Sequence, residues 1–317
     1  MREIGGYLQL EKFTENPYHK EAIELNTGRN ALLYLIKAKQ IQKIYIPYYL
    51  CDSVSNMLKR YGITYEYYHI DTNFKPIISF ELKDQELLYI VNYFGQISNK
   101  QIKEYKDKYS SIVIDNTQAF FQLPVAETDT LYSIRKYFGV PDGAYLYTNQ
   151  TISESLTIDR SSERMRHLLG RYEGKASTYY NDFKENDDSF EGLSLLKMSK
   201  LTKNLLGAID YEQAERIRNE NYGVLSQGLS ELNCLKLSKP NGPFMYPLYI
   251  ENGMEIKKYL ANKKIYIPTL WPNVLRKADH NSIEYQYATN IMPLPCDHRY
   301  GTKEMEYLIR AIKMKGE

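Results

Sequence analysis

Four polar side chains stand at the ends of two consecutive β-like runs, where they can converge on a ligand. Asp115 directly follows the apolar residues 112–114, and Gln118 lies three residues further along. Ser133 and Lys136 close the next β-like run. An amine can attack a carbonyl carbon to form a Schiff base, and a carboxylate can keep a ring nitrogen protonated. These residue types therefore indicate covalent catalysis by Lys136, supported by Asp115.

None of these residue types is diagnostic by itself. An aspartate after a strand often caps a turn, a single glutamine is commonly a loop amide, and a lysine is usually a solvated surface charge. Their shared position favours the catalytic interpretation, because open α/β sheets bind ligands beyond the carboxyl ends of their strands.

The start of a predicted helix offers a site for an anion. Residues 27–31 read Thr-Gly-Arg-Asn-Ala, and apolar residues follow at helical spacing through Ala38. The free N–H groups of Gly28, Arg29 and Asn30 and the positive end of the helix dipole suit a phosphate group, although plain helix capping gives the same pattern. A lysine, an acid and a phosphate site together meet the requirements of pyridoxal 5′-phosphate (PLP), which is the cofactor that we expect.

Strand-like and helical stretches alternate through the N-terminal half. Helical patterns cover residues 28–38, 52–61 and 99–109. This alternation predicts an α/β fold with a mostly parallel sheet and helices on both faces. The β-like runs are residues 44–47, 63–70, 87–93, 112–114, 130–134 and 144–147.

The length of 317 residues favours two domains, because a single hydrophobic core rarely grows that large. We assign residues 1–205 to a large PLP-binding domain with an N-terminal arm, and residues 206–317 to a smaller C-terminal α+β domain. One long helical pattern runs from residue 201 through residue 222, and the small domain ends in a helix over residues 303–312. The charged residues 152–188 are expected to cover a surface or a cleft.

Composition argues against several other classes of protein. A net charge of +2 gives no basic excess for nucleic acid or an anionic membrane, and no run of about 18 apolar residues could span a bilayer. The three cysteines are widely separated, and the N-terminus has no signal-peptide core, so we expect a cytoplasmic protein. The five histidines lack the spacing of a metal site, so no metal is expected.

Five segments resemble the DegT/StrS-type sugar aminotransferases, a family within the aspartate aminotransferase superfamily of fold type I PLP enzymes. The resemblance covers nearly the whole chain, and its most specific part is Asp-x-x-Gln followed by Ser-x-x-Lys. The segments are LNTGRNAL (residues 25–32), IPYYLCDSV (46–54), VIDNTQAFF (113–121), SIRKYFGVPDGA (133–144) and LPCDHRYGTKEM (294–305).

The resemblance implies a fold and a role for each candidate residue. The fold would be PLP-dependent transferase fold type I, with a sheet of the seven-stranded type. Lys136 would be the Schiff-base lysine, Asp115 the partner of the pyridinium nitrogen, and Gln118 the contact to the 3′ oxygen of the cofactor. Tyr49, or a near neighbour such as Cys51, would cover the face of the ring. The residues that would bind the phosphate group are Ser133, Gly28, Arg29 and Asn30.

The resemblance also implies a reaction. The expected activity is amino transfer from glutamate to a nucleotide-linked keto-sugar, in surface polysaccharide or related sugar biosynthesis, by a homodimer. Lys136 would first hold the cofactor and then move a proton between Cα of the substrate and C4′ of the cofactor. The chain departs from the family at one point. In the family, an asparagine reaches the phosphate group across the dimer, whereas this chain has Ser194 and Leu195 near that position.

Three alternative functions stay open at this stage. A PLP-dependent sugar dehydratase would share the fold, but the dehydratases that the chain resembles have a histidine where Lys136 stands. A non-catalytic PLP-fold protein could serve as a binding or regulatory module. The intact set of four candidate residues argues against this alternative. Tyr132 and Lys136 also match the Tyr-x-x-x-Lys pattern of short-chain dehydrogenases, but no glycine-rich dinucleotide turn follows Gly28.

Overall fold

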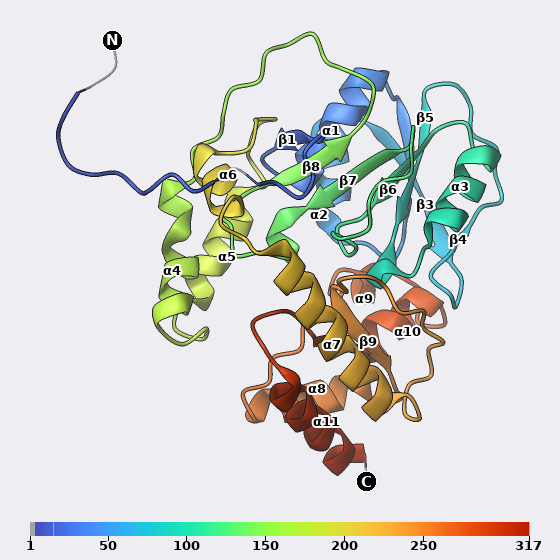
Figure 1. The fold of residues 1–317 in the computed structure, drawn as a ribbon. Helices are drawn as coiled ribbons and strands as arrows, with labels where there is room; N and C mark the ends of the chain where they lie inside the picture. The colour runs from blue at the N-terminus through green and yellow to red at the C-terminus, as the bar shows by residue number, and fades with distance from the viewer. Residues whose placement is uncertain (1–3, 15, 317) are drawn as a thin grey trace.

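An eight-stranded sheet forms the centre of the protein (Figure 1). The computed structural model describes residues 4–14 and 16–316. The strands follow the order β1-β8-β7-β6-β5-β2-β3-β4 across the sheet. Their bounds are β1 Ile23–Leu25, β2 Lys43–Pro47, β3 Thr64–Ile70, β4 Pro76–Ile77, β5 Glu86–Val91, β6 Ile112–Asp115, β7 Asp129–Ser133 and β8 Ala144–Tyr147.

The sheet is mostly parallel, as predicted. Strands β7, β6, β5, β2 and β3 pair in parallel, whereas β1, β8 and β4 join their neighbours in antiparallel fashion. The sheet has eight strands instead of the seven-stranded type that was expected. Strands β1 and β4 were not predicted, because elements of 3 and 2 residues are too short to show a hydrophobic period.

The central strands are apolar because helices cover both faces of the sheet. All four residues of β6 are buried, as are the last five of β5. Helices α1 (Gly28–Lys39), α2 (Asp52–Arg60) and α3 (Asn99–Lys108) lie in the N-terminal half. The connections β2-α2-β3 and β5-α3-β6 progress in opposite directions across the sheet. Since such crossovers are right-handed, α2 and α3 lie on opposite faces.

The charged segment after β8 forms a pair of helices beside the sheet (Figure 1). Helix α4 (Arg166–Glu173) packs against α5 (Tyr180–Ser189), and a 3-10 turn over Ser162–Met165 precedes them. Exposed apolar side chains occur on both helices, including Tyr172 on α4 and Tyr180 on α5. This segment lies at the surface, as expected from its polar composition.

The C-terminal third has a hydrophobic core of its own. Helix α7 packs against α11 and β9, and β9 pairs with β10 in a second, antiparallel sheet. Residues Leu225, Leu248 and Met305 belong to this core, whereas Tyr287 and Ile291 belong to the core of the large sheet. The domain boundary between residues 205 and 206 stays a prediction. The elements are α7 Tyr211–Leu229, β9 Met245–Tyr249, α8 Gly253–Asn262, α9 Val274–Lys277, α10 Ile283–Asn290, β10 Ile291–Pro295 and α11 Thr302–Gly316.

The single helical pattern predicted over residues 201–222 corresponds to two helices, which corrects that expectation. Helix α6 (Lys200–Leu206) ends at Gly207, and α7 begins after Asp210, whose side chain accepts a hydrogen bond from Gln213 N. An N-cap residue such as Asp210 favours the start of a new helix, because its side chain binds a backbone N–H group of the first turn that has no partner within the helix. Of the helices within residues 4–14 and 16–316, none has the length and apolar character to cross a membrane.

Candidate active site

Asp115 and Lys136 lie at the same edge of the sheet, beyond the carboxyl ends of neighbouring strands. Asp115 ends β6 and is paired with Leu131 of the parallel strand β7. Beyond β7, a 3-10 turn over Ile134–Lys136 carries the lysine. The charge of Lys136 acts on Asp115. Lys136 is exposed, and it makes no hydrogen bond or ion pair with any residue that the structure describes. An amine in this position is available to react.

The carboxylate of Asp115 is held by hydrogen bonds from Thr117, through its backbone and its side chain, and from Tyr89. Thr117 N donates to Oδ1 over 2.8 Å, and the hydroxyl of Tyr89 donates to Oδ2 over 2.5 Å. Burial raises the pKa of Asp115, whereas the hydrogen bonds and the charge of Lys136 lower it. A carboxylate offers about four lone-pair positions, so acceptor capacity remains for a further N–H donor. Asp115 can therefore bind a protonated ring nitrogen.

Gln118 is buried in the same edge and is oriented by one hydrogen bond. Its Oε1 accepts from Phe94 N over 2.8 Å. Phe94 has φ 51° and lies in the middle of the 3-10 turn Tyr93–Gly95. The Nε2 group has no partner within the described ranges, so Gln118 presents a donor. A donor is what a phenolate-type oxygen such as the 3′ oxygen of PLP requires.

The predicted phosphate cradle is assembled from α1 and β7. A Cβ built on Gly28 would lie 3.3 Å from Ser133 Cβ and 3.8 Å from Ser133 Oγ. Thr27 caps the helix, and its side chain accepts from Asn30 N. Across the part of the chain that the structure describes, the N–H groups of Gly28 and Arg29 and the Ser133 hydroxyl have no partner. These donors at a helix start suit a phosphate.

Asn30 is hydrogen-bonded to other residues of the protein, and its contact with a phosphate group stays a prediction. Its Nδ2 donates to Asn26 Oδ1 over 2.9 Å and to Ser194 O over 2.8 Å. Its backbone N–H is occupied by Thr27. With its donors engaged, Asn30 fastens the segment around Ser194 to helix α1. Its membership of the phosphate cradle therefore gains no support from these contacts.

Tyr49 lies inside an aromatic cluster. Its side chain is 0% exposed, and its ring centroid lies 5.0 Å from that of Trp271, 5.3 Å from that of Tyr93 and 6.0 Å from that of Tyr287. The buried hydroxyl has no hydrogen-bond partner among the described residues, and burial raises its pKa. The ring packs against its aromatic neighbours, and the role of Tyr49 beside the cofactor ring stays a prediction. Cys51, two residues further along, is half-buried, occupies the N-cap position of α2 without a side-chain capping bond, and acts electrostatically on Tyr89.

The turn after Lys136 is tied to helix α6. Asp142 is fully buried, and its carboxylate accepts from Ser199 N over 2.9 Å, from Ser199 Oγ over 2.6 Å and from Thr202 Oγ1. Gly143, with φ 118°, donates its N–H to Asn26 O over 2.6 Å. A backbone with positive φ at this point favours glycine. These contacts give the turn that carries Lys136 a fixed support.

Tyr89 was missed by sequence reasoning. It lies on β5, two residues before Val91, which is paired with Asp115. Because alternate residues of a strand share a face, Tyr89 and Asp115 lie on the same side of the sheet. The usable signal was a hydroxyl within an otherwise apolar strand, and only the strand register shows which residue it meets.

The dehydrogenase alternative conflicts with this geometry. Tyr132 is fully buried, and its hydroxyl donates to Gln122 O over 2.8 Å. Tyr132 lies within strand β7, whereas Lys136 ends the following 3-10 turn. The tyrosine and the lysine of that motif must share one face of a helix. In this chain they do not form a pair.

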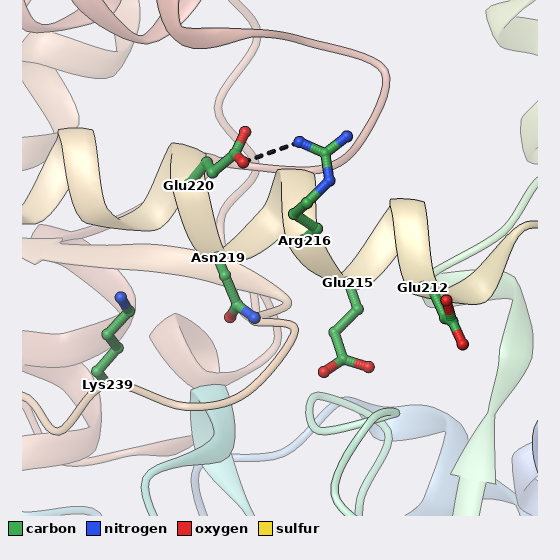
Figure 2. Close-up of a pocket in the computed structure, with 6 residues that line it drawn as sticks. All are labelled: Glu212, Glu215, Arg216, Asn219, Glu220 and Lys239. Carbon is green, nitrogen blue, oxygen red and sulfur yellow. Dashed lines mark hydrogen bonds and ion pairs between the residues drawn. The ribbon is translucent and has the colours of Figure 1, made fainter.

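A surface hollow lies along helix α7 (Figure 2). Its volume is about 390 Å³, and Arg216 on its rim pairs with Glu220 over 2.9 Å. Figure 2 shows Glu215 and Glu212 on the same exposed helix, with Lys239 on the facing loop. These are solvated charges without a buried reactive group. Within the described residues, no group of three metal-ligating side chains occurs either.

Comparisons with known proteins identify the fold. No protein-family model and no curated protein matches the sequence. A DegT DnrJ EryC1 StrS aminotransferase from Brucella abortus matches with a TM-score of 0.64 and 14% identity over 92% of this chain and 85% of that one. NtdA from Bacillus subtilis, with bound cofactor PMP, matches with a TM-score of 0.65 and 15% identity over 96% and 78%. DesI in the presence of its TDP-sugar product matches with a TM-score of 0.65 and 12% identity, over 92% of this chain and 80% of that one. The chain therefore has the predicted PLP-dependent transferase fold type I.

Proposed function

We propose that the chain is a PLP-dependent aminotransferase that transfers an amino group from glutamate to a nucleotide-linked keto-sugar. The observation that carries the proposal is the placement of Asp115 and the exposed Lys136 at the same carboxyl edge of the sheet, where the charge of Lys136 acts on the carboxylate. The fold supports the substrate class, because one protein with this fold was solved with PMP and another with a TDP-sugar product.

The free donors and acceptors of the site fit PLP. The Ser133 hydroxyl and the N–H groups of Gly28 and Arg29 would bind its phosphate group. Asp115 would accept from the ring nitrogen, and Gln118 Nε2 would donate to the 3′ oxygen. When bound, PLP would supply a carbon that accepts the amino group and a conjugated ring that withdraws electrons from it.

The side chains of this chain would then perform three tasks. Asp115, a buried anion, favours the positive charge on the ring nitrogen. Gln118 orients the ring through a single donor. Lys136 Nζ would hold the cofactor covalently and, once released by the incoming amine, would take up the proton from the α-carbon of the amino donor. Its exposure leaves room for a substrate beside it.

Gly28 should be sensitive to the smallest side chain. In Gly28→Ala, the new methyl group would lie 3.3 Å from Ser133 Cβ and must displace the serine or the helix start. We expect PLP affinity to fall about tenfold, which corresponds to about 1.4 kcal/mol. A titration followed by absorbance or fluorescence measures this change. Gly223→Ala is the matched control, because a Cβ there meets nothing within 4 Å. Equal PLP affinity of the two variants would contradict the cradle.

The experiment that tests the proposed function is an absorption spectrum of the purified protein with PLP, before and after borohydride reduction. We expect a band near the visible edge and, after peptide mapping, a reduced adduct on Lys136. Glutamate should then convert the bound PLP to PMP, and nucleotide-linked keto-sugars should return it to PLP. No band and no adduct would refute the cofactor. A band without the glutamate reaction would favour the dehydratase or the non-catalytic alternative.

We also propose that the protein acts as a cytoplasmic homodimer in surface polysaccharide or related sugar biosynthesis. The N-terminal arm supports self-association, because it exposes Ile4, Tyr7 and Leu8 by 97%, 99% and 91%. A group of exposed apolar side chains on one segment is a feature of surfaces that associate. Homodimers with two-fold symmetry are the commonest solution.

A further inference from the structure

The hydroxyl of Tyr89 is the closest polar neighbour of Asp115 on its Oδ2 side. It donates to Oδ2 over 2.5 Å, a length typical of a charge-assisted O–H···O⁻ bond. Thr117 N holds the other oxygen over 2.8 Å. The Thr117 side chain hydrogen-bonds to the carboxylate as well. Donors on both oxygens fix the rotation of the carboxylate plane. The remaining lone pairs are thereby held in one direction.

Tyr89 is itself held in place. It lies at the centre of β5, which is flanked by β2 and β6, and its side chain is 3% exposed. Its carbonyl oxygen accepts the hydroxyl of Tyr68 over 2.7 Å. Burial and the nearby Asp115 raise the pKa of Tyr89, so its hydroxyl stays a donor. The hydroxyl that donates to Asp115 is therefore held in a fixed position.

The surroundings of the pair contain few other charges. Lys136 is the cation that acts on Asp115, from the end of β7. The charge of Asp115 also helps to raise the pKa of Tyr68 on β3 and of Tyr93 in the 3-10 turn Tyr93–Gly95. The Cys51 thiol acts electrostatically on Tyr89. All three of these groups are neutral when protonated. A buried carboxylate in such surroundings depends on its hydrogen bonds to remain ionised.

We propose that Tyr89 is a positioning residue that keeps Asp115 ionised and oriented toward the ring nitrogen of the cofactor. The proposal rests on the proposed function, because it is the PLP ring that needs an anion at this point. Tyr89 does not touch the reacting atoms, and it acts through Asp115. A protonated Asp115 would be neutral, so it could not balance the positive charge of the ring nitrogen. One of its oxygens would carry the proton and would be a poor acceptor for the ring N–H.

The test compares Tyr89→Phe with Tyr132→Phe. The control also removes a buried tyrosine hydroxyl, but one that donates to Gln122 O and accepts from Asn116 instead of bonding to the Asp115 carboxylate. The pH titration of the Asp115 carboxyl carbon is followed by ¹³C NMR in the cofactor-free protein, and its signal is assigned by its loss in Asp115→Asn. In Tyr89→Phe the titration midpoint should rise by about one to two pH units, because one charge-assisted hydrogen bond is lost. In Tyr132→Phe it should not move.

A second readout uses the PLP-loaded enzyme. As the pH drops below the raised midpoint, kcat of Tyr89→Phe should fall about tenfold per pH unit, and it should recover as the pH rises and Asp115 ionises. Tyr89→Phe should add little to the loss in Asp115→Asn, because it acts through that carboxylate. An unchanged midpoint in folded Tyr89→Phe would overturn the role of Tyr89. Failure of the wild-type protein to bind PLP would instead overturn the proposed function, and the two failures are thus distinguishable.

Discussion

Lys136→Ala should lack amino-transfer activity. Proton transfer by a positioned side chain is worth about 10²- to 10⁴-fold in rate, and this variant would lose the covalent link to the cofactor as well. We therefore expect a loss of at least about 10³-fold in kcat, measured with glutamate and an accepting keto-sugar nucleotide. After borohydride treatment, no adduct should be found at position 136. The phosphate cradle and Asp115 remain, so the variant should still bind PLP reversibly.

The structure also indicates that this loss is not a folding defect. Lys136 is exposed and has no ion pair within residues 4–14 and 16–316, so the free energy of unfolding should change by less than about 0.5 kcal/mol. Lys100→Ala is the matched control, because Lys100 is an exposed lysine on α3 and is not one of the candidate site residues. It should keep full activity. Substantial turnover by Lys136→Ala would eliminate this lysine as the catalytic group.

Asp115→Asn should show the second largest effect. The substitution keeps the size of the side chain but removes the negative charge that the protonated ring nitrogen needs. We expect kcat to fall by about 10²- to 10³-fold, comparable with the removal of one electrostatic contact in other active sites. For the wild-type protein, activity should fall as the pH drops through the pKa of Asp115, which burial raises, because only the ionised form binds the protonated nitrogen. Steady-state kinetics over a range of pH measures both effects.

Asp129→Asn serves as the control for Asp115→Asn. Asp129 is also a buried aspartate in the central sheet, at the start of β7, and it pairs with Lys39 instead of facing the site. Its substitution should lower stability and leave kcat near the wild-type value. If Asp115→Asn also lowered stability but kept the wild-type kcat, like the control, Asp115 would have only a structural role.

The apolar periods of the sequence determined most of the large sheet. The run 112–114 and the aspartate after it became β6 because strands buried on both faces must be apolar throughout. Thr27 and Gly28 marked the start of α1, since capping is a local interaction. The placement of Asp115 and Lys136 at the same edge followed from the same logic, because parallel neighbours end at one edge.

Only the tertiary structure decided which partner each polar group meets. Asn30 carried the same cradle signal as Gly28, yet its side chain is taken by Asn26 and by Ser194, a residue far along the chain. The ring of Tyr49 is enclosed by Trp271 from the C-terminal third. Tyr89 meets Asp115 through the register of β5 and β6. Hydrophobic period and capping depend on neighbours in sequence, whereas these contacts depend on how distant strands align, which no local pattern encodes.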